Sequence, residues 1–565
     1  MIIKILGFSF IAFGLSLVSY LLSSTYHGFI YNISDIIGVL GKEDKLQTIL
    51  TERVYFLLKL LSFMPVIIGS LFVIFFKNIQ LYVELRYLIF INIINKVALI
   101  NKKYLLALFI VVLVSLFLRL HYAINYPISY DEAWTYINFT EKGFLSSFSY
   151  YPAPNNHVLH SVLTNISYYF PFSQTINLRF TSIFIGTLSI VLFYLSFRKF
   201  YSDNISLQMT AIFSFLFPIL YYGYEARGYS LIILAFIISF YGAIELVKSE
   251  SHINIKRHWT YLSFGSVLGL YSIPSFLYPY FSIVTFLMYS FVRRKNKKKL
   301  LSLLVSIFIT GIITIVLYSP ILVISGLEEF VGRGTDFHMS RIDVVKGFGD
   351  QFSRVSQLFF YSKWFLLPVL FLSIIALIKA GSNVEIRLAF YIIFVSPLIL
   401  VLHSVDPKPR VWIYLVIPIL FLLGSLFKEF INKRNIKVFG IVSAVATTLL
   451  VFNFNSYVKL HKKFSLEVNS LALYFIDHNV ASIYVNHPLI ETNLSYIFQE
   501  KNKLVSISYS DFDPVKDIES KKGSFEYLVL NKRYNNIHGY KFIRRMCNLE
   551  SCSKAGSSTF IYSKM

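Results

Sequence analysis

Long apolar runs recur along almost the whole chain, and they limit its possible folds more than any other feature. A helix needs about 20 apolar residues to cross the hydrocarbon core of a bilayer. We identify about thirteen runs of suitable length. They lie near residues 5–22, 54–76, 104–121, 176–197, 205–222, 229–247, 259–273, 275–292, 300–322, 361–379, 387–403, 411–427 and 437–455. The sequence therefore predicts an all-α polytopic membrane protein.

The composition supports this class and argues against a nucleic-acid-binding protein. Hydrophobic residues make up 56% of the chain and charged residues only 15%, whereas soluble domains have about 25% charged residues. The formal net charge of +23 would suggest nucleic acid if the protein were soluble. Here the basic residues lie mainly in short loops between apolar runs, where they set orientation. We expect membrane lipid and no nucleic acid among the partners.

The distribution of lysine and arginine predicts the orientation in the membrane. Alternate loops are strongly basic, and the densest of them is the run 293–299. The positive-inside rule places these loops in the cytoplasm. The first apolar run is interpreted as an uncleaved span, because no clear small-residue cleavage site follows it. We therefore expect a multi-pass protein of the plasma (inner) membrane, with a cytoplasmic N-terminus and an extracytoplasmic C-terminal segment.

Three regions are predicted along the chain. Residues 1–100 form an N-terminal extension with two spans and an amphipathic cytoplasmic stretch at 81–96, which we expect on the membrane surface. Residues 101–455 form the transmembrane module. Residues 456–565 form a small extracytoplasmic α/β domain.

Short apolar segments in this last region define the expected strands and helix. A helix is expected at 465–479, and strands at 481–486, 503–509, 525–530 and 558–563. Cys547 and Cys552 lie in this domain. Outside the cytoplasm a local disulfide is the favoured interpretation, and reduced cysteines are the alternative.

An acidic pair, Asp131 and Glu132, begins the first large outer loop, about ten residues beyond a span. Carboxylates just above the bilayer suit general-base chemistry, such as removing a proton from an attacking hydroxyl or amine. A structural interpretation is equally open. Asp131 would then be the N-cap of a short helix, assisted by Ser129.

A second polar cluster follows in the same loop. Asn156 and His157 precede an amphipathic helix, and His160 follows one turn later. An imidazole at this place could hold a phosphate or orient an acceptor. It could also belong to a capped helix at the lipid headgroup level. A metal site is disfavoured because no third soft ligand is evident, and we expect no metal.

Basic residues also lie on the outer side, where the orientation rule predicts few of them. These are Arg119, Arg179, Arg227, Lys408 and Arg410. A single arginine at a helix end can extend harmlessly to the interface. Several around one external cavity need a partner, and a lipid phosphate or diphosphate fits, because guanidinium binds phosphate oxygens in bidentate fashion. Arg227 is the best placed of them, since it lies in a very short turn.

These motifs together resemble a known group of enzymes. The acidic pair after the first core span is similar to that of the protein mannosyltransferase and aminoarabinose transferase-like group of GT-C glycosyltransferases. The same holds for PNNHVLHSVL at 154–163, NLRFTSIFIGTLSIVLFYL at 177–195 and YEARGYSLIILAF at 224–236. The resemblance covers residues 104–300. It extends over 300–455 by topology and by PKPRVWIYLVIPILF at 407–421, and it does not reach residues 1–100.

The resemblance implies a GT-C-like helical bundle with a cavity at the outer leaflet. It implies a membrane glycosyltransferase, usually inverting, whose donor is a polyprenyl-phosphate-linked sugar and whose acceptor is a lipid, glycan or protein. By this analogy Asp131 is the base and Glu132 supports it. The phosphate and substrate would contact the remaining polar residues, with Arg227 as the best motif match. They are Asn156, His157, Arg179, Arg227, Lys408 and Arg410.

The resemblance leaves some points open. Some relatives carry Lys or Glu near the position of His157, so its role is undecided. No cofactor or metal is expected. The alternative function is a lipid-linked sugar flippase or polysaccharide exporter, which would need the basic residues but not the acidic pair. A structural assembly subunit is a third possibility. Charges at outer helix ends, instead of mid-bilayer depth, favour the enzyme.

Overall fold

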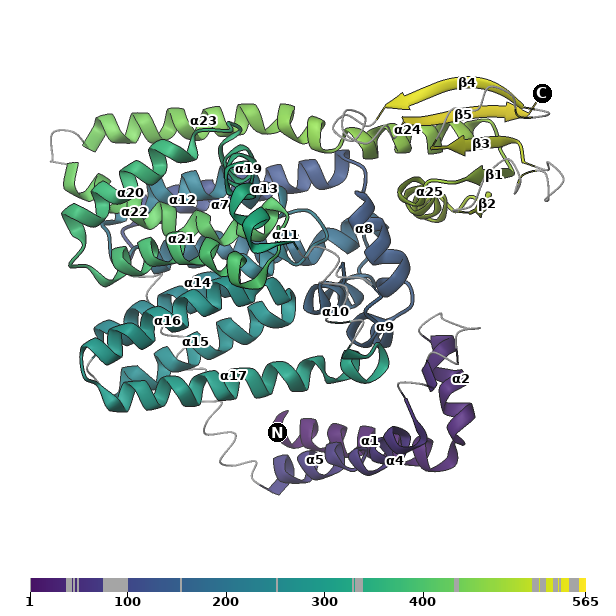
Figure 1. The fold of residues 1–565 in the computed structure, drawn as a ribbon, viewed down its shortest axis with the longest axis horizontal. Coiled ribbons are helices and arrows are strands. Elements are labelled where there is room, and N and C mark those ends of the chain that lie inside the picture. Colours follow the sequence, from purple (N-terminus) through teal and green to yellow (C-terminus); the bar gives the residue numbers. More distant parts are fainter. Residues whose placement is uncertain are drawn as a thin grey trace. The chain divides into compact units, whose positions relative to one another are not determined.

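The computed structural model describes most of the chain, and its contacts divide the chain into two compact units (Figure 1). The described residues are 2–36, 43, 46–47, 50–74, 100–152, 155–249, 252–327, 330, 339–430, 436–510, 518, 525–531, 537, 540–547 and 558–564. The first unit comprises residues 1–110, 142–154 and 314–336, and the second comprises 111–141, 155–313 and 337–565. The predicted amphipathic stretch at 81–96 lies outside the described residues.

The first unit is built around two closely packed apolar helices, α1 (Ile2–Ser23) and α5 (Met64–Ile74). Glycines allow their backbones to approach: a Cβ added at Gly69 would lie 2.5 Å from the carbonyl oxygen of Gly7. Small residues at such contacts are typical of helix pairs in membranes. The shorter helices α2 (Tyr26–Ile36), α4 (Glu52–Leu61) and α9 (Phe144–Ser149) complete this unit.

Nine helical stretches in the described part of the chain are long and apolar enough to cross a membrane, by length and composition. They are Glu52–Ile74, Lys102–Asn125, Gln174–Phe197, Tyr229–Lys248, Pro274–Arg293, Lys297–Ile324, Val384–His403, Pro409–Glu429 and Gly440–His461. The chain is thus a multi-pass helical membrane protein, as the sequence predicts.

The predicted number of thirteen spans is not confirmed. The runs at 5–22 and 361–379 form shorter apolar helices, Gly7–Ser23 and Leu366–Ala380. The run at 205–222 is divided into α12 (Asp203–Phe215) and α13 (Phe217–Tyr221). Leu216 has a non-helical ψ of 137° at the division, and Pro218 has no N–H with which to continue the helical ladder.

Helix α14 (Tyr229–Lys248) packs in the second unit against α11, α15, α16 and α21. In its apolar window 83% of the residues are buried, whereas only 17% are buried in the window of α17 (Lys297–Ile324). Further long helices that lie wholly or mostly in this unit are α7 (Lys102–Asn125), α11 (Gln174–Phe197), α15 (His252–Ser272), α16 (Leu277–Arg293), α19 (Arg341–Phe360), α20 (Leu366–Ala380), α21 (Val384–His403), α22 (Val416–Phe430) and α23 (Ile436–His461). Helix α14 is therefore a core helix, and α17 presents apolar side chains to its surroundings.

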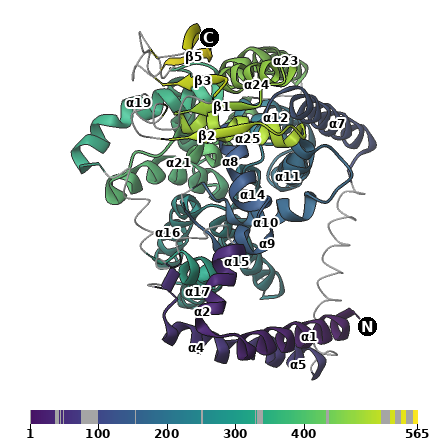
Figure 2. The same ribbon diagram turned by 90° about the vertical axis from the view of Figure 1, so that its right-hand side faces the viewer.

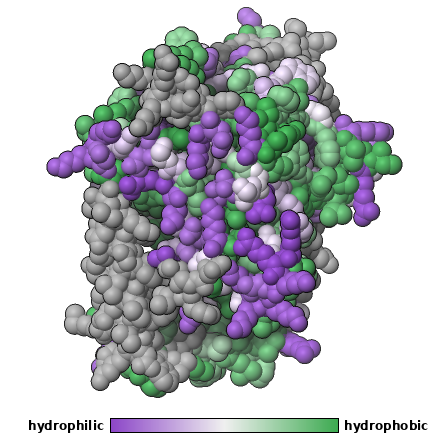
Figure 3. Space-filling model, turned by 90° about the vertical axis from the view of Figure 1, so that its left-hand side faces the viewer, coloured by the Kyte–Doolittle hydropathy of each residue, from purple (hydrophilic) through white to green (hydrophobic). Residues whose placement is uncertain are grey.

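Hydrophilic side chains gather on the face of the molecule that carries the turn between α16 and α17 (Figure 3). Arg293, Arg294 and Lys297 of this turn are exposed. This is the basic run that the sequence predicts to be cytoplasmic.

The C-terminal domain is a five-stranded mixed sheet covered by helices (Figure 2). Its elements are α24 (Lys463–Asp477), β1 (Ser482–Val485), α25 (Pro488–Glu500), β2 (Ser506–Tyr509), β3 (Tyr527–Leu530), β4 (Tyr540–Cys547) and β5 (Ser558–Lys564). The order is β2-β1-β3-β5-β4. Strands β2, β1 and β3 are parallel to one another, and β5 pairs in antiparallel fashion with both β3 and β4. The predicted helix and four predicted strands are confirmed, whereas β4 and α25 were missed. Cys552 lies outside the described residues, so the disulfide stays a prediction.

Candidate functional site

The acidic pair lies on a single-turn helix, α8 (Tyr130–Thr135), just after α7. Ser129 is the N-cap, and its backbone N–H donates to Oε2 of Glu132 at 2.8 Å. This reciprocal capping fixes both the start of the helix and the side chain of Glu132. The capping role foreseen for Asp131 therefore belongs to Ser129 and Glu132. The side chain of Asp131 faces other partners.

Glu132 is buried and fully engaged. Arg179 of α11 binds it in bidentate fashion, with Nε 2.8 Å from Oε1 and Nη2 2.8 Å from Oε2. The backbone N–H of Ala226 donates to Oε1 at 2.8 Å. Burial raises the pKa of Glu132, but the opposing charges of Arg179 and Lys462 outweigh it and hold the pKa well below its usual range. Glu132 is thus an ionised structural group. Its oxygens already accept from other residues, so it is not free to take a proton from an acceptor.

Lys462 and Glu225 complete this buried cluster, and sequence reasoning missed both. Lys462 Nζ lies 3.1 Å from Oε2 of Glu132 and also contacts the carboxylate of Glu225. Ser129 Oγ donates to Oε2 of Glu225 at 3.2 Å. Burial, followed by the charge of Glu132, raises the pKa of Glu225. Two cations and two carboxylates therefore share one dry site, which is stable only when the charges are paired.

Asp131 differs from its neighbour, because its carboxylate remains reachable. Its side chain is 23% exposed, and Oδ2 lies 2.9 Å from Nη1 of Arg410 and 3.6 Å from Nη2 of Arg227. Burial raises the pKa of Asp131, but Arg227, Arg410 and Lys408 together lower it to about 2. Asp131 is therefore an ionised carboxylate at the edge of a cationic cluster.

Arg410 lies on η4 (Pro409–Leu415), the 3-10 helix that leads into α22, and Lys408 is the N-cap of η4. The guanidinium of Arg410 lies over the ring of Tyr229, 5.8 Å from its centroid. Lys408 is exposed and has no carboxylate within ion-pair distance in the part of the chain that the structure describes. Arg227 and Arg410 both pair with the carboxylate of Asp131, and the charge of Lys408 acts on it from farther away, so these three cations exceed this one carboxylate by two positive charges.

Arg227 lies in the turn between α13 and α14 and is 3% exposed. One of its amino groups bonds the side chain of Asn155. The other, Nη2, lies 3.2 Å from Nε2 of His157. The backbone N–H of Gly228 donates to Nδ1 of the same imidazole at 2.8 Å.

This arrangement determines the tautomer of His157. Burial, followed by the charges of Arg227 and Arg410, holds the pKa of His157 well below its usual range, so the ring is neutral. A neutral imidazole carries one N–H and one acceptor nitrogen. Because Nδ1 accepts from Gly228, the proton is on Nε2 and faces an N–H of Arg227. Two donors thus converge, and an anionic oxygen is a partner that could accept hydrogen bonds from both.

Asn156 and His160 stabilise the backbone around the site through hydrogen bonds. Oδ1 of Asn156 accepts from Ser161 Oγ at 2.8 Å within α10 (Val158–Ser167). Nε2 of His160 lies 3.0 Å from Ser182 Oγ, which donates to the backbone carbonyl of Arg227 at 3.1 Å. Among the described residues no group of His, Cys, Asp and Glu could hold a metal ion.

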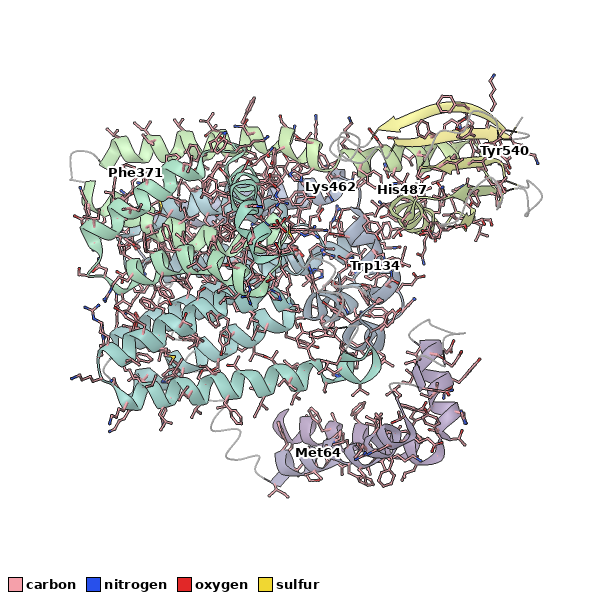
Figure 4. The ribbon with its side chains drawn as sticks, viewed as in Figure 1. Met64, Trp134, Phe371, Lys462, His487 and Tyr540 are labelled. Carbon is pink, nitrogen blue, oxygen red and sulfur yellow. The ribbon has the colours of Figure 1, made fainter. Side chains whose placement is uncertain are left out.

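The C-terminal domain packs directly on the acidic helix. Ala133 and Tyr136 share an apolar core with Leu471 and Phe475 of α24. The ring of Tyr136 meets that of Tyr496 on α25 edge to face, with centroids 5.2 Å apart. Figure 4 labels Trp134 on the acidic segment and Lys462, which lies where α23 meets α24. The domain therefore forms one wall beside the site.

Seven of the eight sequence-predicted site residues meet in two adjoining clusters. These clusters lie at one end of the bundle, by the C-terminal ends of α7 and α23 and the N-terminal ends of α11, α14 and α22. Arg179 and Glu132 belong to the buried cluster. In the other cluster Asp131, Lys408 and Arg410 are at least partly exposed, and they lie beside the buried side chains of His157 and Arg227. Asn156, the eighth, is buried and bonds Ser161. Arg119, another of the basic residues expected on the outer side, is not part of either cluster. It is fully buried within α7, and its guanidinium bonds the backbone carbonyl of Ile219 at 3.3 Å.

Fold and site thus define a multi-pass helical membrane protein with an ionic site at one end of its bundle. No protein-family model and no curated protein matches the sequence. Among solved structures, the chain is similar to ArnT from Cupriavidus metallidurans in the apo state. The identity is 12%, over 76% of this chain and 93% of that one, with a TM-score of 0.49. The structure of the same protein bound to undecaprenyl phosphate has 11% identity, over 76% of this chain and 94% of that one, with a TM-score of 0.49. At this similarity the likeness assigns no activity.

Proposed function

We propose that this protein is a membrane glycosyltransferase that takes a sugar from a polyprenyl-phosphate-linked donor and transfers it to an extracytoplasmic lipid, glycan or protein. The observation that carries the proposal is one reachable carboxylate, Asp131, set among three cations whose charge it does not neutralise. Such a cluster combines a base with a phosphate site, which the two halves of a sugar transfer require.

The phosphate of the donor is assigned to Arg227, Arg410 and Lys408. The donor is a phosphodiester with one negative charge, and the polyprenyl phosphate that leaves is a monoester with a second one, so the excess of two positive charges matches the leaving group. Guanidinium groups bind its oxygens through paired hydrogen bonds. Nε2–H of His157 adds a neutral donor beside Arg227. Because these groups are held by surrounding contacts before the ligand arrives, little reorganisation is needed when charge develops.

The reaction follows from these positions. The acceptor oxygen or nitrogen attacks the anomeric carbon, and its proton passes to the carboxylate of Asp131. The bond between the anomeric carbon and the phosphate oxygen breaks, and the electron pair leaves with the polyprenyl phosphate. The cations stabilise this developing charge. Attack from the side opposite the phosphate inverts the anomeric carbon.

Glu132 is proposed to act indirectly, as a positioning residue. Its oxygens are occupied by Arg179, Lys462 and backbone N–H groups, so it holds α8 in place and leaves the proton transfer to Asp131. The reaction would take place outside the cytoplasm, with the N-terminus inside, as the basic loops predict.

The test is a transfer assay with the purified full chain in detergent. Radiolabelled polyprenyl-phosphate sugars are supplied as a panel, with an envelope extract as acceptor. Wild type should transfer label from one of them, and Asp131→Asn should reduce the rate at least about 100-fold, the usual worth of a general base. Asp203→Asn is the matched control, because Asp203 is also ion-paired and is 24% exposed. Equal rates for Asp131→Asn and wild type would refute the assignment of the base.

A further inference from the structure

Asp131 and the proposed phosphate share the same binding groups. Oδ2 of Asp131 lies 2.9 Å from Arg410 and 3.6 Å from Arg227. The other amino group of Arg227 is already taken by the side chain of Asn155. A phosphate oxygen that binds Arg410 and the second amino group of Arg227 must therefore come to the place where Oδ2 now lies.

The two anions repel each other at this distance, so both cannot keep full contact with the same guanidinium groups. The phosphodiester of the donor carries one negative charge, as the carboxylate does, but it can use Lys408 and His157 as well. The exposed side of Asp131 gives its carboxylate somewhere to move.

We infer that Asp131 and the phosphate of the donor compete for Arg227 and Arg410, so that binding of the donor releases the carboxylate that deprotonates the acceptor. This inference rests on the proposed function. It explains how a carboxylate that is tied to two arginines becomes a useful base only when a donor is present. An acceptor that enters an empty site finds the base occupied.

The inference makes an unusual prediction about affinity. Removing the charge of a binding-site residue usually weakens binding, but removing the competing carboxylate should strengthen it. Asp131→Asn should bind a polyprenyl phosphate about 10-fold more tightly than wild type, because the ion pair no longer has to be broken. Asp131→Ser, which shortens the side chain, should shift the affinity in the same direction.

The experiment measures saturable binding of a labelled polyprenyl phosphate to the full chain in detergent, with no sugar and no acceptor present. Asp203→Asn serves as the control for the change in net charge, because its partner Arg198 lies at the opposite end of α11. Its affinity should equal that of wild type. A parallel series with inorganic phosphate as competitor separates the headgroup from the lipid tail, and the same variants should be more sensitive to it.

Each outcome is decisive. Unchanged or weaker binding by both Asp131 variants would overturn the competition while leaving the phosphate site intact. Tighter binding of the lipid without greater sensitivity to inorganic phosphate would assign the effect to the tail, and would also overturn it. Absence of saturable binding by wild type would instead refute the proposed function.

Discussion

Lys462 meets Glu132 in a fully buried contact, with Nζ 3.1 Å from Oε2, although 330 residues separate them in the sequence. Lys462 lies between the last membrane helix and the first helix of the C-terminal domain. Glu132 is adjacent to the reachable Asp131. The placement of the proposed base is therefore tied to the point at which the C-terminal domain begins.

Loss of this lysine should destabilise the protein strongly. Lys462→Met leaves Glu132 and Glu225 with only Arg179 between them, and breaking a buried pair in this way costs about 3–5 kcal/mol. A lower unfolding temperature in detergent is the expected result. The double variant Lys462→Met with Glu225→Gln restores the charge balance and should recover part of the loss. Lys459→Met, a change of an exposed lysine near the end of α23, should have little effect. Similar unfolding temperatures for both lysine variants would contradict the pairing.

The ion pair of Asp131 should also appear in the pH dependence of stability. The pKa of this group is lowered from 3.8 to about 2 in the folded protein. Its pairing therefore stabilises the folded state above about pH 4 and is lost as the pH falls toward about 2. The unfolding temperature of wild type should fall more steeply over this window than that of Asp131→Asn. Parallel curves for the two proteins would show that Asp131 is not paired in the folded state.

The assigned tautomer of His157 predicts opposite results for two substitutions. The side-chain amide of Asn lies near the position that Nδ1 of His157 occupies. The longer side chain of Gln brings its amide near the position of Nε2, which is the nitrogen that faces the proposed phosphate. His157→Asn should weaken binding of a polyprenyl phosphate by about 10-fold, the worth of a hydrogen bond to a charged group, whereas His157→Gln should bind almost as wild type does. The reverse order would show that Nδ1 carries the proton.

Close packing around Arg119 predicts a further difference in stability. A Cβ at Gly223 would lie 2.3 Å from Nε of Arg119 and 2.7 Å from the carbonyl oxygen of Ile219. Gly223→Ala should thus destabilise the protein by about 1–3 kcal/mol, as overpacking does. Gly311→Ala is the control, since a Cβ there meets nothing within 4 Å. Chemical denaturation of both variants measures the difference, and equal midpoints would argue against this packing.

The sequence predicted the membrane class, and it singled out most residues of the candidate site, because both leave local signals. Apolar runs reveal spans without any tertiary information, and Asp131, Arg227 and Arg410 are conspicuous as charged residues at helix ends that the sequence predicts to be outside. The break at Leu216 was missed because the apolar run continues through it, while the backbone does not.

Other features depend on contacts between distant segments. Asp131 and Glu132 look equivalent as neighbours in the sequence, but only the fold shows that one is reachable and the other saturated. Glu225 could have been noticed, since it stands two residues before Arg227. Lys462 gave no signal, because a lysine after an apolar run is common at any membrane surface. Its role exists only through its two buried partners.

The proposed phosphate site is tested most directly by an experimental structure of the protein with a polyprenyl phosphate bound. The phosphate should lie within hydrogen-bond distance of Arg227, Arg410 and Nε2 of His157, with Lys408 nearby and the carboxylate of Asp131 displaced from Arg410. A phosphate bound elsewhere, with the ion pair of Asp131 and Arg410 still in place, would contradict it.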